Sequence, residues 1–578
     1  MKKFFALFLS FSLLLSLFPL FGEGDVVELK VYNWEDYISI DDGSGESVDL
    51  IKKFEQHCKE KFGLNVKVKY STFGTLENMY NELQLTKTKA EDGSYTYAYD
   101  LVCPSDYMLQ KMIIEGMVEK YDYSIEEGKL GHVNGYYDNA SKFIVDLFKK
   151  YGWQDYATVY MWGTMGYVYN PAVFEKLPGY KKGDETHWDF IWKEYAKNLG
   201  TIKDSIRDTY ALALGYVYRD ELTELAKSYK SGSLTKEQYA DKIVALFNRA
   251  DEESVNKVEE ALSVLKENIY GFEVDSGKKD MATGKIAINF AWSGDAVYTL
   301  DTADEDENGA ELYYAVPEEG SNIWFDGWVM PKGANVPLAQ EFINFLAQPE
   351  NAKANMDYIG YTSAIGGEEM FENCVENYGT YIMVECDAPK EGESEKAEEK
   401  PAEGEEKAEA EGEEEEEEAK PFLDKESGKY YCDKYVGELS EEELNKFKNA
   451  DGTYNFLYPD YDKDDNVTGM HKEENVTLYK NDLNYFFANK TTDAAEEKKD
   501  FTVITDVIGR QCSAQYPTED IVSRCAIMKY FDDTEMRRLN DMWDEVKVSS
   551  SGMSMVIPVI IVVLTFLVFI VVAIMKRR

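Results

Sequence analysis

An alternation of extended and helical patterns opens the chain and restricts its fold more than any other feature. Residues 65–70 alternate apolar and polar side chains, as a half-buried strand does, whereas residues 49–62 repeat apolar residues at helical spacing. Strand patterns at 26–31, 65–70 and 99–103 are separated by helical patterns at 49–62 and 75–85, and a helix at 107–116 ends at its glycine. This order predicts a parallel α/β sheet.

A second group of patterns follows and predicts a second lobe. Residues 159–170 form an aromatic, strand-rich stretch, and the charged, partly amphipathic residues 221–267 are typical of surface helices. Strand character returns at 285–292 and 312–317, and an amphipathic helix is expected at 338–346. With 578 residues the chain is long enough for two or more domains with substantial cores.

The region 366–515 breaks this pattern and is interpreted as an insertion. Its acidic part, 388–420, includes an unbroken run of glutamates at 413–418. Such a run repels itself and buries no surface, so it is expected to be disordered. Residues 430–487 are aromatic again and are expected to dock as an ordered part, and a helical pattern at 519–546 is expected to close the globular part.

Both ends of the chain carry apolar segments that predict where it resides. Residues 1–24 combine two lysines with a long apolar run, as in a cleaved secretory signal peptide; an uncleaved N-terminal anchor is the alternative. Residues 555–575 carry no charge and predict a transmembrane helix, with the basic residues 576–578 as a cytoplasmic tail. A single-pass protein at the extracytoplasmic, periplasmic face of the cytoplasmic membrane is therefore expected.

The composition excludes several classes of function. A net charge of −47 leaves no basic footprint for nucleic acid, although the acidic excess alone indicates only solubility. The seven cysteines contain no Cys-x-x-Cys pair and the four histidines are scattered, so no metal site, cofactor or Ser-His catalysis is expected. An exported chain permits disulfides, and bridges are expected late in the chain, from Cys374 onward.

Five separated segments place aromatic, hydroxyl or carboxylate side chains at the expected ends of strands or helices. They are Tyr-Asn-Trp-Glu-Asp-Tyr at 32–37, Pro-Ser-Asp-Tyr at 104–107, Trp-Ser-Gly-Asp at 292–295, Ile-Trp-Phe-Asp at 323–326 and Tyr-Ile-Gly-Tyr at 358–361. A single such Trp is more often a core residue, and a single such Asp a cap or turn residue. An aromatic face beside a carboxylate suits a cation, so five such segments in order predict one cation-binding cleft.

The same segments, in order and context, resemble the spermidine/putrescine-binding proteins of ABC importers. Further matches are Asp-Leu-Val-Cys-Pro-Ser at 100–105, Lys-Met-Ile-Ile-Glu-Gly-Met at 111–117, Tyr-Met-Trp-Gly at 160–163 and Glu-Phe-Ile-Asn-Phe-Leu-Ala-Gln-Pro-Glu at 341–350. The resemblance covers about residues 28–365 and the helix at 519–546, and the acidic insertion and the C-terminal apolar segment depart from it. It implies the two-lobed periplasmic-binding-protein fold of type II, an α/β fold in which a ligand is trapped between lobes that close on a hinge.

The resemblance also implies how the lobes divide the chain and which residues bind the ligand. Lobe 1 is expected at 26–157 with about 297–335, and lobe 2 at 158–296 with about 336–365 and 516–546. The implied ligand-binding residues are Trp34, Asp36, Tyr37, Ser105, Tyr107, Asp208, Trp292, Asp295, Trp324, Asp326 and Tyr361. Asp204 is an alternative to Asp208 as the carboxylate of the second lobe.

The implied function is capture of a polyamine, putrescine or spermidine, and its delivery to an ABC permease and its ATPase. A polyamine is a methylene chain with ammonium groups, which needs flat apolar walls and a carboxylate for each ammonium. Alternatives are a membrane-anchored polyamine sensor or adhesin that reuses the fold, and a binder of another cationic solute such as an amino sugar or a metal chelate. An enzyme is not expected: paired carboxylates would suit a glycosidase, but no nucleophile–base arrangement emerges.

Overall fold

The computed structural model describes residues 26–43, 45, 47–89, 93–306, 308–389, 421–462, 466–495 and 499–548. Four predicted segments lie wholly or mostly outside these residues: the signal peptide at 1–24, the acidic stretch at 388–420, the transmembrane helix at 555–575 and the tail at 576–578. Within the described part of the chain, no helix combines the length and the apolar character that a membrane span requires.

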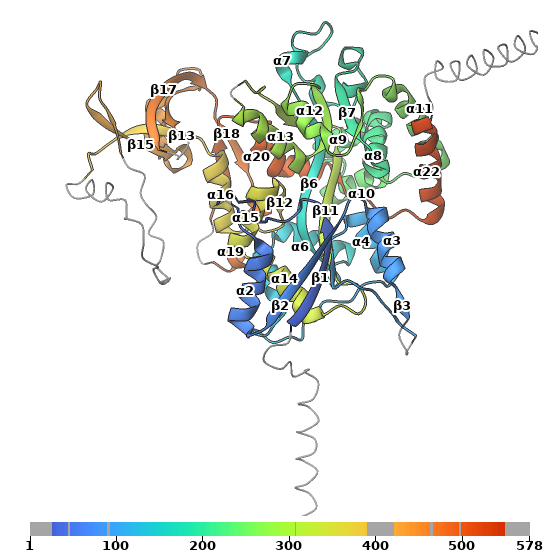
Figure 1. Ribbon diagram of the computed structural model, residues 1–578. Helices are drawn as coiled ribbons and strands as arrows, with labels where there is room; N and C mark the ends of the chain where they lie inside the picture. The colour runs from blue at the N-terminus through green and yellow to red at the C-terminus, as the bar shows by residue number, and fades with distance from the viewer. Residues whose placement is uncertain are drawn as a thin grey trace, which may run out of the picture.

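One large mixed sheet runs through both lobes in the order β2–β1–β5–β11–β6–β9–β7–β8 (Figure 1). Its strands are β1 (Val26–Trp34), β2 (Asn65–Phe73), β5 (Leu101–Val102), β6 (Ala157–Tyr169), β7 (Gly200–Lys203), β8 (Gly271–Glu273), β9 (Ile288–Trp292) and β11 (Ser321–Val329). The pairs at the two ends of the sheet are parallel, β1 with β2 and β5, and β7 with β8 and β9. The predicted parallel α/β sheet is thus confirmed at the two ends, while β6 and β11 in the middle are antiparallel.

Strand β6 joins the two lobes because its two halves have different partners. Its first half pairs with β11, from Ala157 to Thr164, and its second half pairs with β9, from Met165 to Tyr169. All but the last of its thirteen residues are buried, so both faces of the strand are covered and its side chains do not alternate between buried and exposed. Strands β6 and β11 are therefore the segments about which the lobes are expected to move.

The first lobe holds β1, β2 and β5 together with a group of helices, toward the bottom of Figure 1. The helices are α2 (Leu50–Phe62), α3 (Leu76–Thr86), α4 (Asp106–Ile114), α5 (Asn134–Asn139), α6 (Lys142–Tyr151), α14 (Val336–Leu346) and α15 (Pro349–Ile359). In α2, the Asp49 side chain accepts the Lys52 N–H at the start, and Gly63 ends the helix in the left-handed conformation. The predicted apolar face of α2 is confirmed, since its buried residues are Leu50, Phe54 and Cys58.

The second lobe packs helices around β7, β8 and β9. They are α7 (Pro171–Phe174), α8 (Ile206–Val217), α9 (Arg219–Lys230), α10 (Lys236–Phe247), α11 (Glu252–Lys266), α12 (Ser276–Ala282), α13 (Ser293–Glu305), α20 (Gln511–Gln515), α21 (Glu519–Ser523) and α22 (Asp533–Val548). Helix α22 packs against α11 and α8, and β20 (Cys525–Ala526) pairs with β11. Late segments of the chain therefore complete the second lobe.

The chain returns to the first lobe later than the sequence predicts. Residues 297–335 were assigned to lobe 1, but α13 packs on α12 and β10 (Tyr313–Ala315) pairs with the second-lobe half of β6. Residues 336–365 were assigned to lobe 2, but Phe342 of α14 packs edge-on against Phe54 of α2, with ring centroids 4.9 Å apart. The reason is that strand β11 runs from the second lobe to the first, where it ends at Val329 beside β5.

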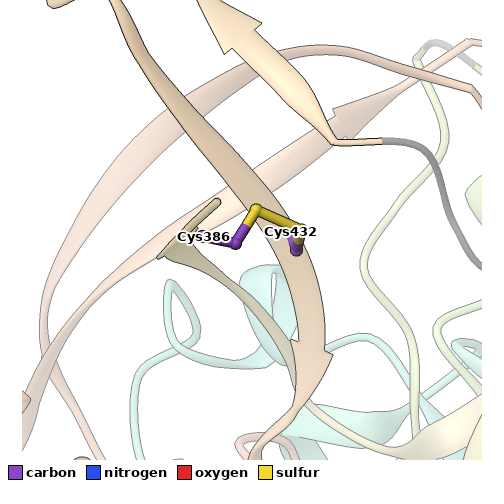
Figure 2. Close-up of a disulfide and its surroundings, with 2 residues drawn as sticks. All are labelled: Cys386 and Cys432. Atoms are coloured by element: carbon purple, nitrogen blue, oxygen red, sulfur yellow. A yellow bond between two sulfur atoms is a disulfide. The ribbon is translucent and has the colours of Figure 1, made fainter. Parts of the chain in front are cut away.

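The insertion forms small sheets beside the lobes, at the left of Figure 1. After α16 (Glu368–Tyr378), its strands are β13 (Tyr381–Cys386), β14 (Phe422–Asp424), β15 (Lys429–Tyr435), β16 (Tyr454–Tyr461), β17 (Val467–Val476), β18 (Tyr479–Asp482) and β19 (Thr502–Thr505). They enclose a separate small core of Ile382, Val436 and Phe456. Figure 2 shows the disulfide between Cys386 and Cys432, which joins β13 to β15 and lies in the region where bridges are predicted.

Candidate functional site

Asp326 lies at the centre of the predicted cleft, where the middle of β11 faces the first lobe. Its Oδ1 accepts a hydrogen bond from the Ser105 hydroxyl at 2.6 Å, and its Oδ2 accepts one from the Tyr37 hydroxyl at 2.9 Å. Strand β11 has an irregularity between Asp326 and Gly327, and Gly327 donates its N–H to the carbonyl of Pro104. The bulge therefore turns Asp326 toward the N-terminus of α4, which begins just after Ser105.

The Asp326 side chain is buried, and burial makes the ionised form of its carboxylate unfavourable. Its side chain is only 7% exposed in the folded chain, and burial raises its pKa to about 6. The Ser105 and Tyr37 hydroxyls lower that pKa, but Asp208 raises it further. Within the described residues, no lysine or arginine pairs with Asp326. A buried carboxylate with only neutral donors gains strongly from a cationic partner.

Two further carboxylates lie near Asp326. Burial raises the pKa of Asp208, at the start of α8, although Ser205, Lys203, Arg207 and the Trp292 indole lower it. Burial also raises the pKa of Asp106 well above its usual range, and Asp326 and Asp208 raise it further.

The alternative carboxylate, Asp204, points elsewhere. Its two carboxylate oxygens each accept a hydrogen bond from Lys547 of α22, at 2.8 Å. The side chain of Asp204 therefore faces the outside of the second lobe, and Asp208 is the second-lobe carboxylate near Asp326.

An aromatic wall connects the two lobes beside these carboxylates. The Tyr361 ring meets the Tyr37 ring edge-on at 5.2 Å and the Trp324 ring at 5.7 Å. Tyr361 approaches α13 closely because residue 294 is glycine: a Cβ there would lie 2.4 Å from its ring. Tyr37, Trp324 and Asp326 are all less than 9% exposed, so the wall and the carboxylate are buried together.

Asp295 and Trp292 lie at the end of β9, as predicted. The cation beside them, however, is a side chain of the protein itself. The Nζ atom of Lys203 lies 2.9 Å from Oδ2 of Asp295 and 4.2 Å from the centre of the Trp292 ring. The Tyr361 hydroxyl donates to Oδ1 of Asp295 at 2.7 Å. These contacts outweigh burial, so the pKa of Asp295 is lowered, in contrast to that of Asp326.

A cationic side chain of the protein also lies over the ring of Tyr107, and the sequence does not predict this contact. The guanidinium of Arg207 lies 4.6 Å from the Tyr107 ring centre and 4.0 Å from that of Phe531. It donates to the carbonyl of Lys529 at 2.9 Å, which connects α8 to the segment before α22. Arg207 thus lies over the ring of Tyr107, which the resemblance names as a ligand-binding residue.

Two predicted residues stand apart from the others. Trp34 packs against Phe73 at 4.7 Å, and Asp36 is exposed with a left-handed backbone, φ +49°. Within the described chain, neither forms a hydrogen bond or ring contact with the other predicted ligand-binding residues. Burial raises the pKa of Tyr358, and the charges of Asp42 and Asp36 raise it further, which places Asp36 near the helix that precedes Tyr361.

Comparison with known proteins gives consistent results. The family model described as bacterial extracellular solute-binding protein matches residues 49–367. The putrescine-binding periplasmic protein PotF of Escherichia coli (strain K12) is 26% identical over 344 residues, which are 58% of this chain and 77% of that protein. The spermidine/putrescine-binding periplasmic protein of the same organism is 28% identical over 369 residues, 63% of this chain and 85% of that protein.

Among solved structures, the spermidine/putrescine ABC transporter substrate-binding protein PotD from Streptococcus pneumoniae is 29% identical. The match covers 58% of this chain and 83% of that chain, with a TM-score of 0.40.

Proposed function

Because the chain belongs to the family of bacterial extracellular solute-binding proteins, we propose that it captures a polyamine between its two lobes. The ligand would be putrescine or spermidine, the molecules for which the relatives described above are named. The family is one of solute-binding proteins, so the chain is a binding protein and not an enzyme.

The observation that carries the proposal is the setting of Asp326. Its buried carboxylate receives hydrogen bonds from two neutral hydroxyls, and Asp208 nearby adds a second negative charge. An ammonium group placed there would relieve both the burial and the repulsion, and each charge-assisted hydrogen bond contributes about 1.5–3 kcal/mol.

The aromatic side chains support a ligand with apolar methylene groups. Tyr361, Tyr37 and Trp324 form a continuous wall beside Asp326. Such a wall attracts an ammonium through the ring faces and also covers the hydrocarbon between ammonium groups. A sugar or an amino acid would instead require several polar groups along its whole length.

Closure of the lobes offers a route from capture to transport. Tyr37 belongs to the first lobe, and Tyr361 bonds to Asp295 of the second lobe, so the cleft side chains join both lobes. A ligand that pairs with Asp326 would favour the closed arrangement over an open one. We propose that an ABC permease with its ATPase receives the polyamine from the closed form.

The apolar segment 555–575 supports a tether to the membrane. Its length and lack of charge fit a single transmembrane helix, and the basic residues 576–578 would favour the cytoplasmic side. The polyamine-binding lobes would then stay at the periplasmic face, close to a permease.

Calorimetric titration of the full chain in mild detergent tests the proposed ligand. Putrescine and spermidine should both be measured, with 1,4-butanediol as an uncharged analogue of putrescine. We expect micromolar or tighter binding of at least one amine and no measurable binding of the diol. Absence of heat and of thermal stabilisation with both amines would rule the proposed function out.

A further inference from the structure

A fully buried lysine lies among the predicted ligand-binding residues. Lys203 is the last residue of β7, and its side chain is 1% exposed. Its Nζ atom lies 2.9 Å from Oδ2 of Asp295, 3.0 Å from Oε1 of Glu273 and 3.0 Å from the carbonyl oxygen of Val274. An ammonium group has three N–H donors, so these three acceptors use all of them.

Lys203 therefore makes the contacts that the sequence assigns to a ligand ammonium. It pairs with the carboxylate of Asp295 and lies over the face of the Trp292 ring at 4.2 Å. Both contacts stabilise a desolvated cation. Burial lowers the pKa of Lys203, but the carboxylates of Asp295 and Glu273 outweigh it, so the pKa is raised.

The two buried carboxylates at this end, Asp295 and Glu273, are paired without a ligand. Lys203 contacts both of them, and Lys278 lies 3.6 Å from Oδ1 of Asp295 and 3.3 Å from Oδ1 of the exposed Asp275. Glu273 uses its remaining capacity on Asn289 and on the N–H of Gly277. A further ammonium brought here would meet a saturated carboxylate and a like charge.

The other end of the cleft is not balanced. Arg207 offsets the charge of Asp106, and both Lys203 and Arg207 offset that of Asp208, whereas Asp326 has only the neutral donors Ser105 and Tyr37. Asp326 is therefore a buried carboxylate without a cation of the protein beside it, and a ligand ammonium can pair with it.

We infer that Lys203 is a built-in ammonium that occupies the Asp295 end of the cleft, so that the Asp326–Asp208 end receives the ligand's charges and a diamine is preferred to a triamine. The inference rests on the proposed function and extends it to ligand selectivity. Lys203 acts here as a specificity-determining residue: a third ammonium extending toward Trp292 would be repelled in a setting poor in water.

A ligand series on the unmodified full chain tests this selectivity. Spermidine is putrescine with an aminopropyl group on one nitrogen, and N-propylputrescine is the same molecule without the terminal amine. Titration calorimetry should give N-propylputrescine at least threefold tighter than spermidine, and putrescine about tenfold tighter than spermidine. Spermidine binding within threefold of N-propylputrescine, or tighter, would overturn the inference.

Two variants test Lys203 itself. Lys203→Met frees Asp295 and Glu273 for an ammonium from the ligand, so spermidine affinity relative to putrescine should rise about tenfold. Lys203→Met combined with Glu273→Gln removes one charge of each sign and frees Asp295 alone. This double variant tests the same contact if the single variant does not fold. Far-ultraviolet circular dichroism checks the fold, and an unchanged spermidine-to-putrescine ratio in a folded variant contradicts the inference.

The outcomes separate this inference from the proposed function. If the unmodified chain binds neither putrescine, spermidine nor N-propylputrescine, the proposed function fails and the inference fails with it. If putrescine binds but selectivity does not depend on Lys203, only the inference fails.

Discussion

Tyr37 donates its hydroxyl hydrogen to Oδ2 of Asp326 across 2.9 Å, linking the segment after β1 to the middle of β11. The only other side-chain donor to Asp326 in the described structure is the Ser105 hydroxyl. Two neutral donors orient the carboxylate without neutralising it, so its charge is held ready for a cation. Asp295 differs, because Lys203 and the Tyr361 hydroxyl both bond to its carboxylate.

Polyamine affinity should fall as the pH drops below about 6. The pKa of Asp326 in the free protein is about 6, so at lower pH a proton must leave before an ammonium can pair with the carboxylate. The dissociation constant for putrescine should rise up to tenfold per pH unit below that value. Calorimetry between pH 4.5 and 8 would check this. Asp326→Asn serves as the control, because its affinity should be weaker throughout and its pH profile flatter.

Without ligand, Asp326 should make the fold less stable at neutral pH than at pH 4. A carboxyl group whose folded pKa is about 6 and whose unfolded pKa is about 4 takes up a proton on folding between these values. Because of this group, the free energy of unfolding should rise by up to about 3 kcal/mol as the pH falls from 6 to 4. Urea unfolding should show Asp326→Asn more stable than the natural chain at pH 7, and the difference should disappear near pH 4. A variant that is less stable at pH 7 would contradict the prediction.

Asp295→Asn should destabilise the second lobe. The substitution leaves the buried Lys203 ammonium with one carboxylate fewer, and breaking a buried ion pair from one side costs about 3 kcal/mol. Thermal or urea unfolding at pH 7 measures the loss. Asp275→Asn is a matched control, because Asp275 also pairs with a lysine but is 80% exposed and should have little effect. Equal stability of the two variants would mean that Asp295 is not required to hold Lys203.

Gly294→Ala should weaken polyamine binding by moving the aromatic wall. A Cβ at residue 294 would lie 2.4 Å from the Tyr361 ring, so the ring must shift away from Tyr37 and Asp295. We expect at least a tenfold loss of putrescine affinity, measured by calorimetry. Gly271→Ala in β8 is the control, since nothing lies within 4 Å of its added Cβ. Unchanged affinity in Gly294→Ala would show that the Tyr361 position does not matter for binding.

Local patterns predicted the elements of the fold well, because they depend on residues close in the chain. The strands β1 and β2 and helix α2 follow from alternation and helical spacing. The division into lobes was less predictable. It depends on which half of β6 each segment meets, and that is decided by long-range packing such as Phe54 against Phe342.

The site was predictable where its residues carry an unusual combination of side chains, although Asp326 lies in the middle of β11 and not at the end of a strand. Asp326, Tyr37, Ser105 and Tyr361 are brought together as expected. Lys203 was missed because its partner Asp295 is 92 residues away, and a lysine in sequence is ordinarily a surface residue. One signal was present: Lys203 ends the apolar strand β7, which is the position at which the other site residues occur.

A crystal structure of the chain with putrescine tests the central claim most directly. We predict an ammonium nitrogen within about 2.7–3.2 Å of an Asp326 carboxylate oxygen, with the methylene chain against Tyr361 and Trp324 and with Lys203 still bound to Asp295. Putrescine bound outside this cleft, or an ammonium at Asp295 with Lys203 displaced and Asp326 unoccupied, would contradict the account.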